Sequence, residues 1–398
     1  MTSLPPDHPF GIHNLPYGVA TIGADPRRRV VVRIGEHALD LSTAAGRLRP
    51  EYAGLFQGGT LNPLLAAGHT AWSAVREQLT DWLREPPPEL GPLLHPLSKL
   101  RNHLPFEVAD YVDFYASPHH AANVGRLLRP DQPALPANWK HLPAGYHGRA
   151  GTVVVSGTNI RRPSGQARDA EGSVIFGPSR RLDIEAEIGF VVGGPTRLGQ
   201  PVPLAGAAEH IFGICLVNDW SARDIQAWEY VPLGPFLGKS FATSISPWIV
   251  PLAALDPARV PPPARDEPLL PYLDDSTATP WGLDIAMTVS INDTVVSRPP
   301  FATMYWTAAQ QLAHLTVNGA SLRAGDLFAS GTVSGPDAGQ QGCLLELTGN
   351  GAQPLTLADA TVRSFLLDGD VVTISGHAIG GTHPPIGLGE VTGRIVPA

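Results

Sequence analysis

The amino-acid sequence predicts a mainly β or α+β protein, and three observations carry this prediction. Apolar runs of strand length recur at short intervals after about residue 105, and glycine or proline separates nearly all of them. Regular helices are missing between these runs, which disfavours a parallel βαβ sheet and favours a mainly antiparallel arrangement. The chain holds 42 glycines and 41 prolines among 398 residues, which is more than usual but below the range typical of low-complexity segments. We therefore expect a folded, turn-rich chain.

Two domains are expected from the length and from a proline-rich linker. The first covers residues 1–105 and contains one predicted helix, which starts with Asn62 as N-cap, continues through a proline and ends near Leu83. The prolines between residues 86 and 96 end this helix and are typical of a linker. The second domain is expected over residues 106–398.

The second domain should consist mostly of strands. Six apolar runs are the clearest candidates, at residues 152–156, 184–192, 211–217, 248–250, 285–291 and 371–374. Two helices interrupt them: residues 117–128, opened by Ser117 and Pro118, and residues 303–317, ended by Asn318-Gly319. Residues 256–280 are rich in proline and should form a surface excursion.

Composition and charge exclude several function classes. The formal net charge is -8, only 16% of residues are charged, and no Lys/Arg stripe occurs, which argues against nucleic acid and an anionic membrane surface as partners. The N-terminus lacks the pattern of an export signal, and no run approaches the roughly 18 apolar residues of a membrane span. Two cysteines, Cys215 and Cys343, cannot build a disulfide framework, so a cytoplasmic location is expected.

The most informative segment is the acidic run at residues 182–190. Strict alternation along one strand would place Asp183, Glu185 and Glu187 on one face, with neighbours about 6.5 to 7 Å apart. Such a row is typical of a solvated strand edge. It would equally suit a hard divalent cation, which binds carboxylate oxygens and offsets their repulsion.

Asp219 could supply a further oxygen, because it follows the apolar strand 211–217. Ser221 and Asp224 match a capping box that would open a short helix there. Arg223 and Gln226 would then share a helix face and could bind an anion or a developing oxyanion. The alternative is that Asp219 caps the turn and Arg223 pairs with a surface acid.

Residues 234–240 resemble a phosphate-binding loop but depart from it. A Walker A motif needs four residues between its glycines, and here only three separate Gly234 from Gly238. Pro235 also removes a backbone donor. We therefore do not expect a nucleotide site, although Lys239 is well placed to act as a cation after this turn.

His119 and His120 lie in the first turn of the predicted helix 117–128. The positive end of a helix favours a neutral imidazole, which can accept a proton from water. A structural role is the alternative for either histidine. The sequence has no His-Glu-x-x-His or Cys-x-x-Cys zinc spacing and no Gly-x-Ser-x-Gly nucleophile elbow.

Taken together, these segments resemble the fumarylacetoacetase family. The matching stretches are residues 110–115, 143–149, 218–230, 231–240 and 365–370. The resemblance implies a small SH3-like β-barrel over residues 1–105, a mixed β-sandwich roll over residues 106–398, and a homodimer. It also implies hydrolysis of the carbon-carbon bond of 4-fumarylacetoacetate to fumarate and acetoacetate, the last step of tyrosine and phenylalanine degradation.

The resemblance further implies Ca²⁺ or Mg²⁺ as cofactor and assigns it ligands. Four carboxylates would hold the cation, namely Asp113, Glu185, Glu187 and Asp219. Asp183 is left outside this set, which corrects the row of three carboxylates. Lys239 and Thr243 fall where the family holds a second, structural cation.

Catalytic and substrate-binding roles follow from the same resemblance. His120, rather than His119, would be the base, with Glu346 orienting it. The tetrahedral oxyanion would be surrounded by Arg223, Gln226 and Lys239. Substrate contacts would come from Tyr115, Arg129, Tyr146, Gln226, Tyr230 and Thr332.

Two alternatives compete with this hypothesis. A relative could use the same cation platform for another reaction, but the run 228–233 and the full N-terminal domain argue against it. A non-catalytic Ca²⁺-binding module would keep the carboxylates and lose the histidine and glutamate pair, yet His120 and Glu346 are both present.

Overall fold

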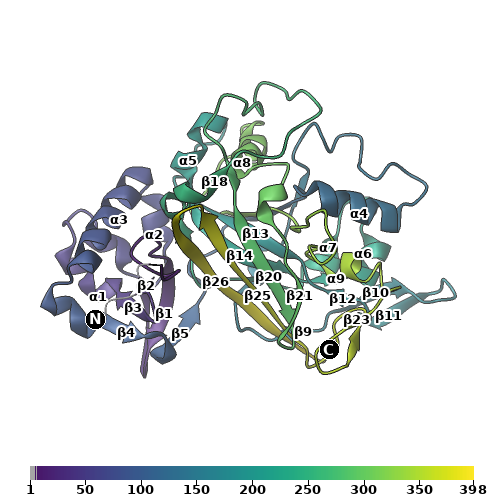
Figure 1. The fold of residues 1–398 in the computed structure, drawn as a ribbon, viewed down its shortest axis with the longest axis horizontal. Helices are drawn as coiled ribbons and strands as arrows, with labels where there is room; N and C mark the ends of the chain where they lie inside the picture. The colour runs from purple at the N-terminus through teal and green to yellow at the C-terminus, as the bar shows by residue number, and fades with distance from the viewer. Residues whose placement is uncertain (1–4, 6) are drawn as a thin grey trace.

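A computed structural model describes residues 5 and 7–398 of the chain. The first four residues, on which the expected lack of an export signal partly rests, lie outside the described residues. Three layers are visible in Figure 1: a small N-terminal unit at one side, long strands in the centre, and short helices at the other side. No helix within the described part is long and apolar enough to cross a membrane.

The N-terminal unit is built on a five-stranded antiparallel sheet in the order β4-β3-β2-β1-β5. Its strands are β1 (Tyr17–Ile22), β2 (Asp25–Ile34), β3 (His37–Asp40), β4 (Leu94–Pro96) and β5 (Leu100–His103). The prediction of one helix from Asn62 to Leu83 is wrong. Two helices are present, α2 (Asn62–Ala66) and α3 (His69–Arg84), because Gly68 between them has a φ of 80° and breaks the helical path.

The larger unit contains an eight-stranded sheet that carries most of the site. Its main path runs β7-β6-β22-β13-β14-β16-β8, and β17 pairs with β14 beside this path. The strands are β6 (Tyr111–Phe114), β7 (Gly145–His147), β8 (Val153–Val155), β13 (Ala186–Val192), β14 (Ile211–Asp219), β16 (Thr243–Ile245), β17 (Val250–Pro251) and β22 (Leu327–Ala329). Most neighbours are antiparallel, as predicted, but β6 pairs with β22 and β8 with β16 in parallel.

A second sheet of five strands packs across the first, in the order β21-β20-β25-β26-β9. Its strands are β9 (Ile160–Arg161), β20 (Ile285–Ile291), β21 (Thr294–Ser297), β25 (Val371–Gly380) and β26 (His383–Val396). Leu216 on the first sheet joins Val289 and Ile374 on the second in one core. The predicted strands 285–291 and 371–374 are confirmed as β20 and the start of β25.

The opposite face of the eight-stranded sheet is covered by the N-terminal unit. Val191, Val217 and Leu327 from this sheet share a core with Val32 and Trp72 of the N-terminal unit. The eight-stranded sheet is therefore apolar on both faces, which explains why its strands are continuous apolar runs rather than alternating ones.

Short elements complete the fold. The helices are α1 (Leu41–Ala44), α4 (Pro118–Leu128), α5 (Ala207–His210), α6 (Arg223–Glu229), α7 (Phe236–Lys239), α8 (Ala308–Thr316) and α9 (Leu344–Leu347). Paired strands outside the large sheets are β10 (Ser164–Arg168) with β11 (Val174–Pro178), β12 (Leu182–Asp183) with β15 (Ser221–Ala222), β18 (Arg259–Val260) with β19 (Gly282–Leu283), and β23 (Leu355–Thr356) with β24 (Val362–Arg363).

The two helices predicted in the second domain are present, with one correction. Ser117 caps α4, since its hydroxyl accepts a hydrogen bond from the backbone of His120. The second helix does not begin near residue 303. Thr307 is the N-cap of α8, where it forms a capping box with Gln310, and the helix is followed by Gly319 with a φ of 90°.

Candidate active site

The acidic run is not one continuous strand, so the expected alternation of its carboxylates is wrong. β12 ends at Asp183 and β13 begins at Ala186. Between the two strands, backbone amides bind side-chain oxygens instead of the carbonyls of a neighbouring strand. The Ile184 amide donates to Asp183 Oδ1 at 2.7 Å, and the Glu185 amide donates to Asn218 Oδ1 at 3.2 Å. The break separates Asp183 from the other carboxylates, and Arg223 becomes its partner.

Three carboxylates meet at one end of the eight-stranded sheet. Asp113 lies in β6, Asp219 ends β14, and Glu185 immediately precedes β13. Each offers one oxygen to a group in which all such oxygens lie within 4.8 Å of one another. Glu187 of β13 is outside that tight group, but the charges of Asp113, Glu185 and Asp219 act on it and raise its pKa further, after burial. All four side chains are buried.

This carboxylate cluster fits a hard divalent cation. Both oxygens of Glu187 and Oδ1 of Asp113 are buried without a hydrogen-bond partner among the described residues. Burial raises the pKa of Asp113, Glu187 and Asp219, and repulsion from neighbouring carboxylates adds to this rise; at Asp219 the charge of Lys239 offsets part of it. Oxygen atoms without donors and crowded negative charge are what Mg²⁺ or Ca²⁺ would satisfy.

Lys239 and Arg223 offset part of the buried negative charge. Lys239 Nζ lies 2.5 Å from Glu185 Oε2 and 2.7 Å from Asp219 Oδ2. Arg223 Nη1 lies 2.7 Å from Glu185 Oε1. Burial alone would raise the pKa of Glu185, but the positive charges of Lys239 and Arg223 outweigh burial, and the pKa is lowered overall. The two positive side chains are fewer than the five carboxylates, which are the four of the cluster and Asp183. The uncompensated negative charge can accommodate a divalent cation.

The second cation expected at Lys239 and Thr243 has no side-chain support from Lys239. An ammonium group has three donors and no lone pair, so only the carbonyl oxygen of this residue could bind a cation. Thr243 Oγ1 donates to Asp219 Oδ1 at 2.6 Å. The threonine therefore fixes the orientation of the Asp219 carboxylate.

The helix that carries Arg223 and Gln226 starts differently from the prediction. Ser221 does not cap it: Ser221 belongs to β15, its hydroxyl donates to the Asp219 carbonyl, and Ala222 is the N-cap of α6. Asp224 instead accepts hydrogen bonds from the Ser179 hydroxyl and the Arg180 amide. Arg223 and Gln226 still share a helix face, with Nη1 of the arginine 3.2 Å from Oε1 of the glutamine.

A close helix contact brings Lys239 to this group. A Cβ atom on Gly238 would lie 2.7 Å from the Gln226 Cα atom, so only glycine lets α7 approach α6 this closely. The segment that resembled a phosphate loop is therefore a short helix packed on α6, and its lysine faces the carboxylates.

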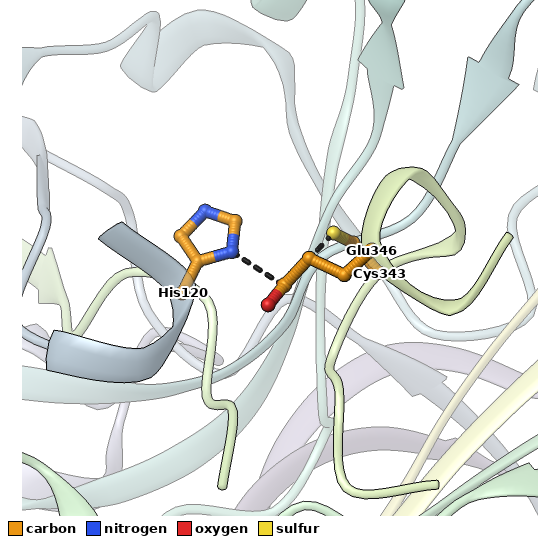
Figure 2. Close-up of side chains that lie close together, drawn as sticks. All are labelled: His120, Cys343 and Glu346. Carbon is orange, nitrogen blue, oxygen red and sulfur yellow. Dashed lines mark hydrogen bonds and ion pairs between the residues drawn. The ribbon is translucent and has the colours of Figure 1, made fainter. Parts of the chain in front are cut away.

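His120 and Glu346 form a second cluster beside the carboxylates. Their side chains point at each other from α4 and α9, with Cys343 behind the glutamate (Figure 2). His120 Nδ1 lies 2.6 Å from Glu346 Oε2, and the two side chains are 5% and 1% exposed. Burial alone would raise the pKa of Glu346, but the nearby His120, with hydrogen bonds to the carboxylate, lowers it. His119, the neighbouring histidine, has no contact of this kind with Glu346.

One cavity of about 490 Å³ joins the two clusters. The expected site residues that line it are Asp113, Tyr115, His120, Tyr146, Glu185, Arg223, Gln226, Tyr230, Lys239 and Thr332. Besides Asp113 Oδ1, two further buried polar atoms of the lining residues, Arg223 Nη2 and Thr332 Oγ1, have no hydrogen-bond partner among the described residues. Such atoms in a half-closed cavity point to a polar ligand.

Comparison with known families accounts for nearly the whole chain. Residues 110–396 match the family model described as fumarylacetoacetate hydrolase C-terminal, and residues 13–105 match fumarylacetoacetase N-terminal. The chain belongs to the fumarylacetoacetase family.

Individual relatives agree with this membership. Fumarylacetoacetase of Homo sapiens is 45% identical and covers 98% of this chain and 97% of its own length. The Arabidopsis thaliana enzyme is 46% identical with the same coverage, and the Caenorhabditis elegans enzyme is 45% identical over 100% of this chain and 98% of its own. The chain is therefore a hydrolase of carbon-carbon bonds.

Solved structures show the same fold at lower identity. A fumarylacetoacetate hydrolase from Exiguobacterium antarcticum has a TM-score of 0.58 at 17% identity, covering 96% of this chain and 100% of that one. A maleylpyruvate hydrolase from Sphingobium has a TM-score of 0.55 at 15% identity, with the same coverage. The fold of this chain therefore also occurs in proteins named for other activities.

Two residues that were not predicted from the sequence, Arg181 and Asn350, line the cavity of this fumarylacetoacetase family member. Arg129 was predicted as a substrate contact, but it is not among the lining residues. Arg181 Nη2 donates to the Asn350 carbonyl at 2.9 Å. Arg181 lies just before the acidic run, and this proximity was the one available signal for it. Nothing in the sequence pointed to Asn350, because this residue lies in the turn after α9 and comes to the cavity only in the folded chain.

Proposed function

We propose that the chain hydrolyses the carbon-carbon bond of 4-fumarylacetoacetate to fumarate and acetoacetate, a step of tyrosine and phenylalanine degradation. The observation that carries this proposal is the single cavity between the His120 and Glu346 pair and the buried carboxylates. Cleaving a β-diketone needs an activated water, a stabilised oxyanion and a leaving carbanion held as an enolate. Each need has residues beside the cavity.

His120 is the proposed base. Glu346 accepts a hydrogen bond from Nδ1, which fixes the tautomer and leaves Nε2 free to take a proton from water. The same Nε2–H can then return the proton to the leaving carbon. Glu346 is held in turn by Asn123 Nδ2 at 2.9 Å and Ser334 Oγ at 2.9 Å, so the pair is rigid before substrate arrives.

Arg223, Gln226 and Lys239 are the proposed donors to the oxyanion. Arg223 holds two carboxylates through Nε and Nη1, and its Nη2 keeps a free N–H beside the cavity. A fixed, buried donor of this kind stabilises charge that develops in the transition state without reorganisation. Lys239 supplies a full positive charge from the opposite helix, α7.

Asp113, Glu185, Glu187 and Asp219 are the proposed ligands of Mg²⁺ or Ca²⁺. The bound ion would supply a Lewis acid for the diketone oxygens and the enolate. We also assign Thr243 the role of orienting Asp219. A second, structural cation is proposed to bind at the Lys239 carbonyl together with Thr243. The charge balance and the unpartnered oxygens described above support the principal site.

Substrate contacts are proposed for Tyr115, Arg129, Tyr146, Tyr230 and Thr332. A planar guanidinium suits the substrate carboxylate through paired hydrogen bonds. Arg181, which lines the cavity, is a second candidate for this contact.

We further propose the larger organisation from the sequence. A boundary near residue 105, with an SH3-like first domain and a β-roll second domain, is supported by the five short antiparallel strands and by the two family-model ranges. A homodimer is supported by exposed apolar side chains, Val231, Leu233 and Phe236, on the loop between α6 and α7 and at the start of α7. The two cysteines are free and buried, which supports a cytoplasmic location.

A direct assay tests the proposed activity. Purified protein is mixed with fumarylacetoacetate, and the diketone absorbance is followed with Mg²⁺ or Ca²⁺ and with a chelator. We expect loss of the diketone that depends on the cation and forms fumarate and acetoacetate in equal amounts. No loss at saturating cation would exclude the proposal.

A further inference from the structure

Asp183 is a buried carboxylate that the proposed chemistry does not use. Its side chain is 0% exposed, and it lies at the end of β12. It is not part of the carboxylate group formed by Asp113, Glu185 and Asp219, and its oxygens bind other partners. A carboxylate in such a place would be costly unless it were fully hydrogen-bonded.

Four hydrogen bonds satisfy the Asp183 carboxylate. Oδ1 accepts from the amides of Ile184 at 2.7 Å and Leu344 at 2.7 Å. Oδ2 accepts from the Leu345 amide at 2.9 Å and from Arg223 Nε at 2.8 Å. Asp183 therefore ties a side chain on α6 to the backbone that begins α9.

Both of these elements carry proposed catalytic groups. Arg223 lines the cavity and its Nη2 has no partner among the described residues, while Asp183 and Glu185 hold its other nitrogens. Glu346 directly follows the two amides that Asp183 binds, and it holds His120. One carboxylate thus fixes the oxyanion donor and the partner of the base in relation to each other.

We propose that Asp183 is a positioning residue that sets the distance between the oxyanion donor Arg223 and the proton-transfer pair His120 and Glu346. The inference rests on the proposed function, since it assigns Asp183 a part in the same reaction. Without this carboxylate, Arg223 keeps Glu185 as its one carboxylate partner and is drawn toward the cation cluster. The amides of Leu344 and Leu345 lose their common acceptor at the same time.

The test compares Asp183→Asn with a matched buried carboxylate away from the site. Asp370 is also buried, pairs with Arg363 at 2.8 Å and accepts from the Leu367 amide. We expect Asp183→Asn to lower kcat by at least about 100-fold, as loss of an oxyanion donor does, while KM changes by less than about threefold. Asp370→Asn should lower thermal stability and leave kcat per folded molecule within about twofold of wild type.

A double-mutant cycle separates positioning from a general effect on folding. If Asp183 acts through Arg223, adding Asp183→Asn to Arg223→Gln should lower kcat by less than about threefold beyond Arg223→Gln alone. Multiplied losses in the double variant, or a kcat of Asp183→Asn within about threefold of wild type, would overturn the inference. Should Asp183→Asn not fold, Asp183→Ser, which keeps an oxygen acceptor for the amides, carries the same expectations. The wild-type assay judges the proposed function independently, because the inference concerns only ratios between variants.

Discussion

Nδ1 of His120 lies 2.6 Å from Oε2 of Glu346, although 226 positions separate the two residues in the sequence. The glutamate is held on all sides: Asn123, Ser334 and Cys343 also donate hydrogen bonds to it. The His120 imidazole therefore has Nδ1 hydrogen-bonded to the protein, and its Nε2 is available to a ligand in the cavity.

His120→Ala should lower kcat by at least about 100-fold, because general bases contribute roughly 10² to 10⁴ in rate. The unfolding free energy should fall by about 1 to 3 kcal/mol, since Glu346 loses a buried partner. Steady-state kinetics and urea unfolding measure the two effects. His119→Ala is the matched control and should keep nearly full activity; equal losses in both variants would remove His120 from the role of base.

Glu187→Gln should have opposite effects on stability with and without the cation. In chelator, the variant should melt higher than wild type, because one buried carboxylate that repels Asp113 is gone. In saturating Mg²⁺ or Ca²⁺, it should gain less stability than wild type, since a ligand is lost. Differential scanning fluorimetry over a cation series checks both signs. A rise in melting temperature on adding the cation that equals the wild-type rise would contradict a ligand role for Glu187, and a melting temperature below wild type in chelator would contradict the repulsion.

Removal of the cation should make stability depend on pH. Burial and mutual repulsion raise the pKa of Asp113, Glu187 and Asp219 above their unfolded values of about 4. The folded state then binds protons more tightly than the unfolded state, so these groups favour folding at low pH and lose that contribution as pH rises through their folded pKa values.

The chelated protein should therefore gain stability relative to the cation-bound protein as pH falls from about 8 toward 5.5. Thermal melts at several pH values, with and without chelator, measure the gap between the two forms. A gap that widens on acidification would mean that the carboxylates do not hold the ion.

Arg181 and Arg129 can be separated by their effects on substrate affinity. Arg181 lines the cavity and Arg129 does not, so Arg181→Gln should raise KM for fumarylacetoacetate by about 10-fold or more with a smaller change in kcat. Arg129→Gln should change KM less. Michaelis–Menten kinetics of the two variants decide the matter, and a larger KM effect at Arg129 would restore the assignment made from the resemblance.

Gly238→Ala tests the close approach of α6 and α7. The added methyl group would lie 2.6 Å from Gln226 Cβ and 2.7 Å from its Cα, so α7 must move outward and take Lys239 with it. Activity should fall by about 10-fold or more, with a loss of roughly 1 to 3 kcal/mol in stability from overpacking. Gly177→Ala is a suitable control, because a Cβ atom on Gly177 would meet nothing within 4 Å. Gly234→Ala is not, because the φ of 111° at Gly234 would strain any other residue.

Local signals in the sequence predicted those elements that local chemistry controls. Ser117 and Pro118 start α4 as expected, and the apolar run 285–291 is β20. The single predicted helix across Gly68 and the continuous strand across Glu185 were wrong. In both cases one residue, a glycine with positive φ or an asparagine from a neighbouring strand, overrides the periodicity of a longer segment.

The sequence allowed most residues of the site to be named, but it did not allow the hydrogen bonds and ion pairs between them to be predicted. Asp219 and the pair His119 and His120 were candidates from the residues themselves, and the resemblance added Asp113 and Glu346 and chose His120. The structure places these side chains around one region. The partners of Asp183 could not be inferred from spacing, because Leu344 lies 161 positions away from it. Arg181 was missed for the same reason: its contact with Asn350 spans 169 positions.

The double-sided packing of the eight-stranded sheet limits how this protein can be dissected. A fragment that starts at residue 106 would encode all the proposed catalytic groups, yet it would leave Val191, Val217 and Leu327 without the N-terminal side chains that cover them. Such a bare apolar sheet face favours self-association over a soluble product. The first hundred residues supply none of the proposed chemistry, and they cover the apolar sheet face of the catalytic half.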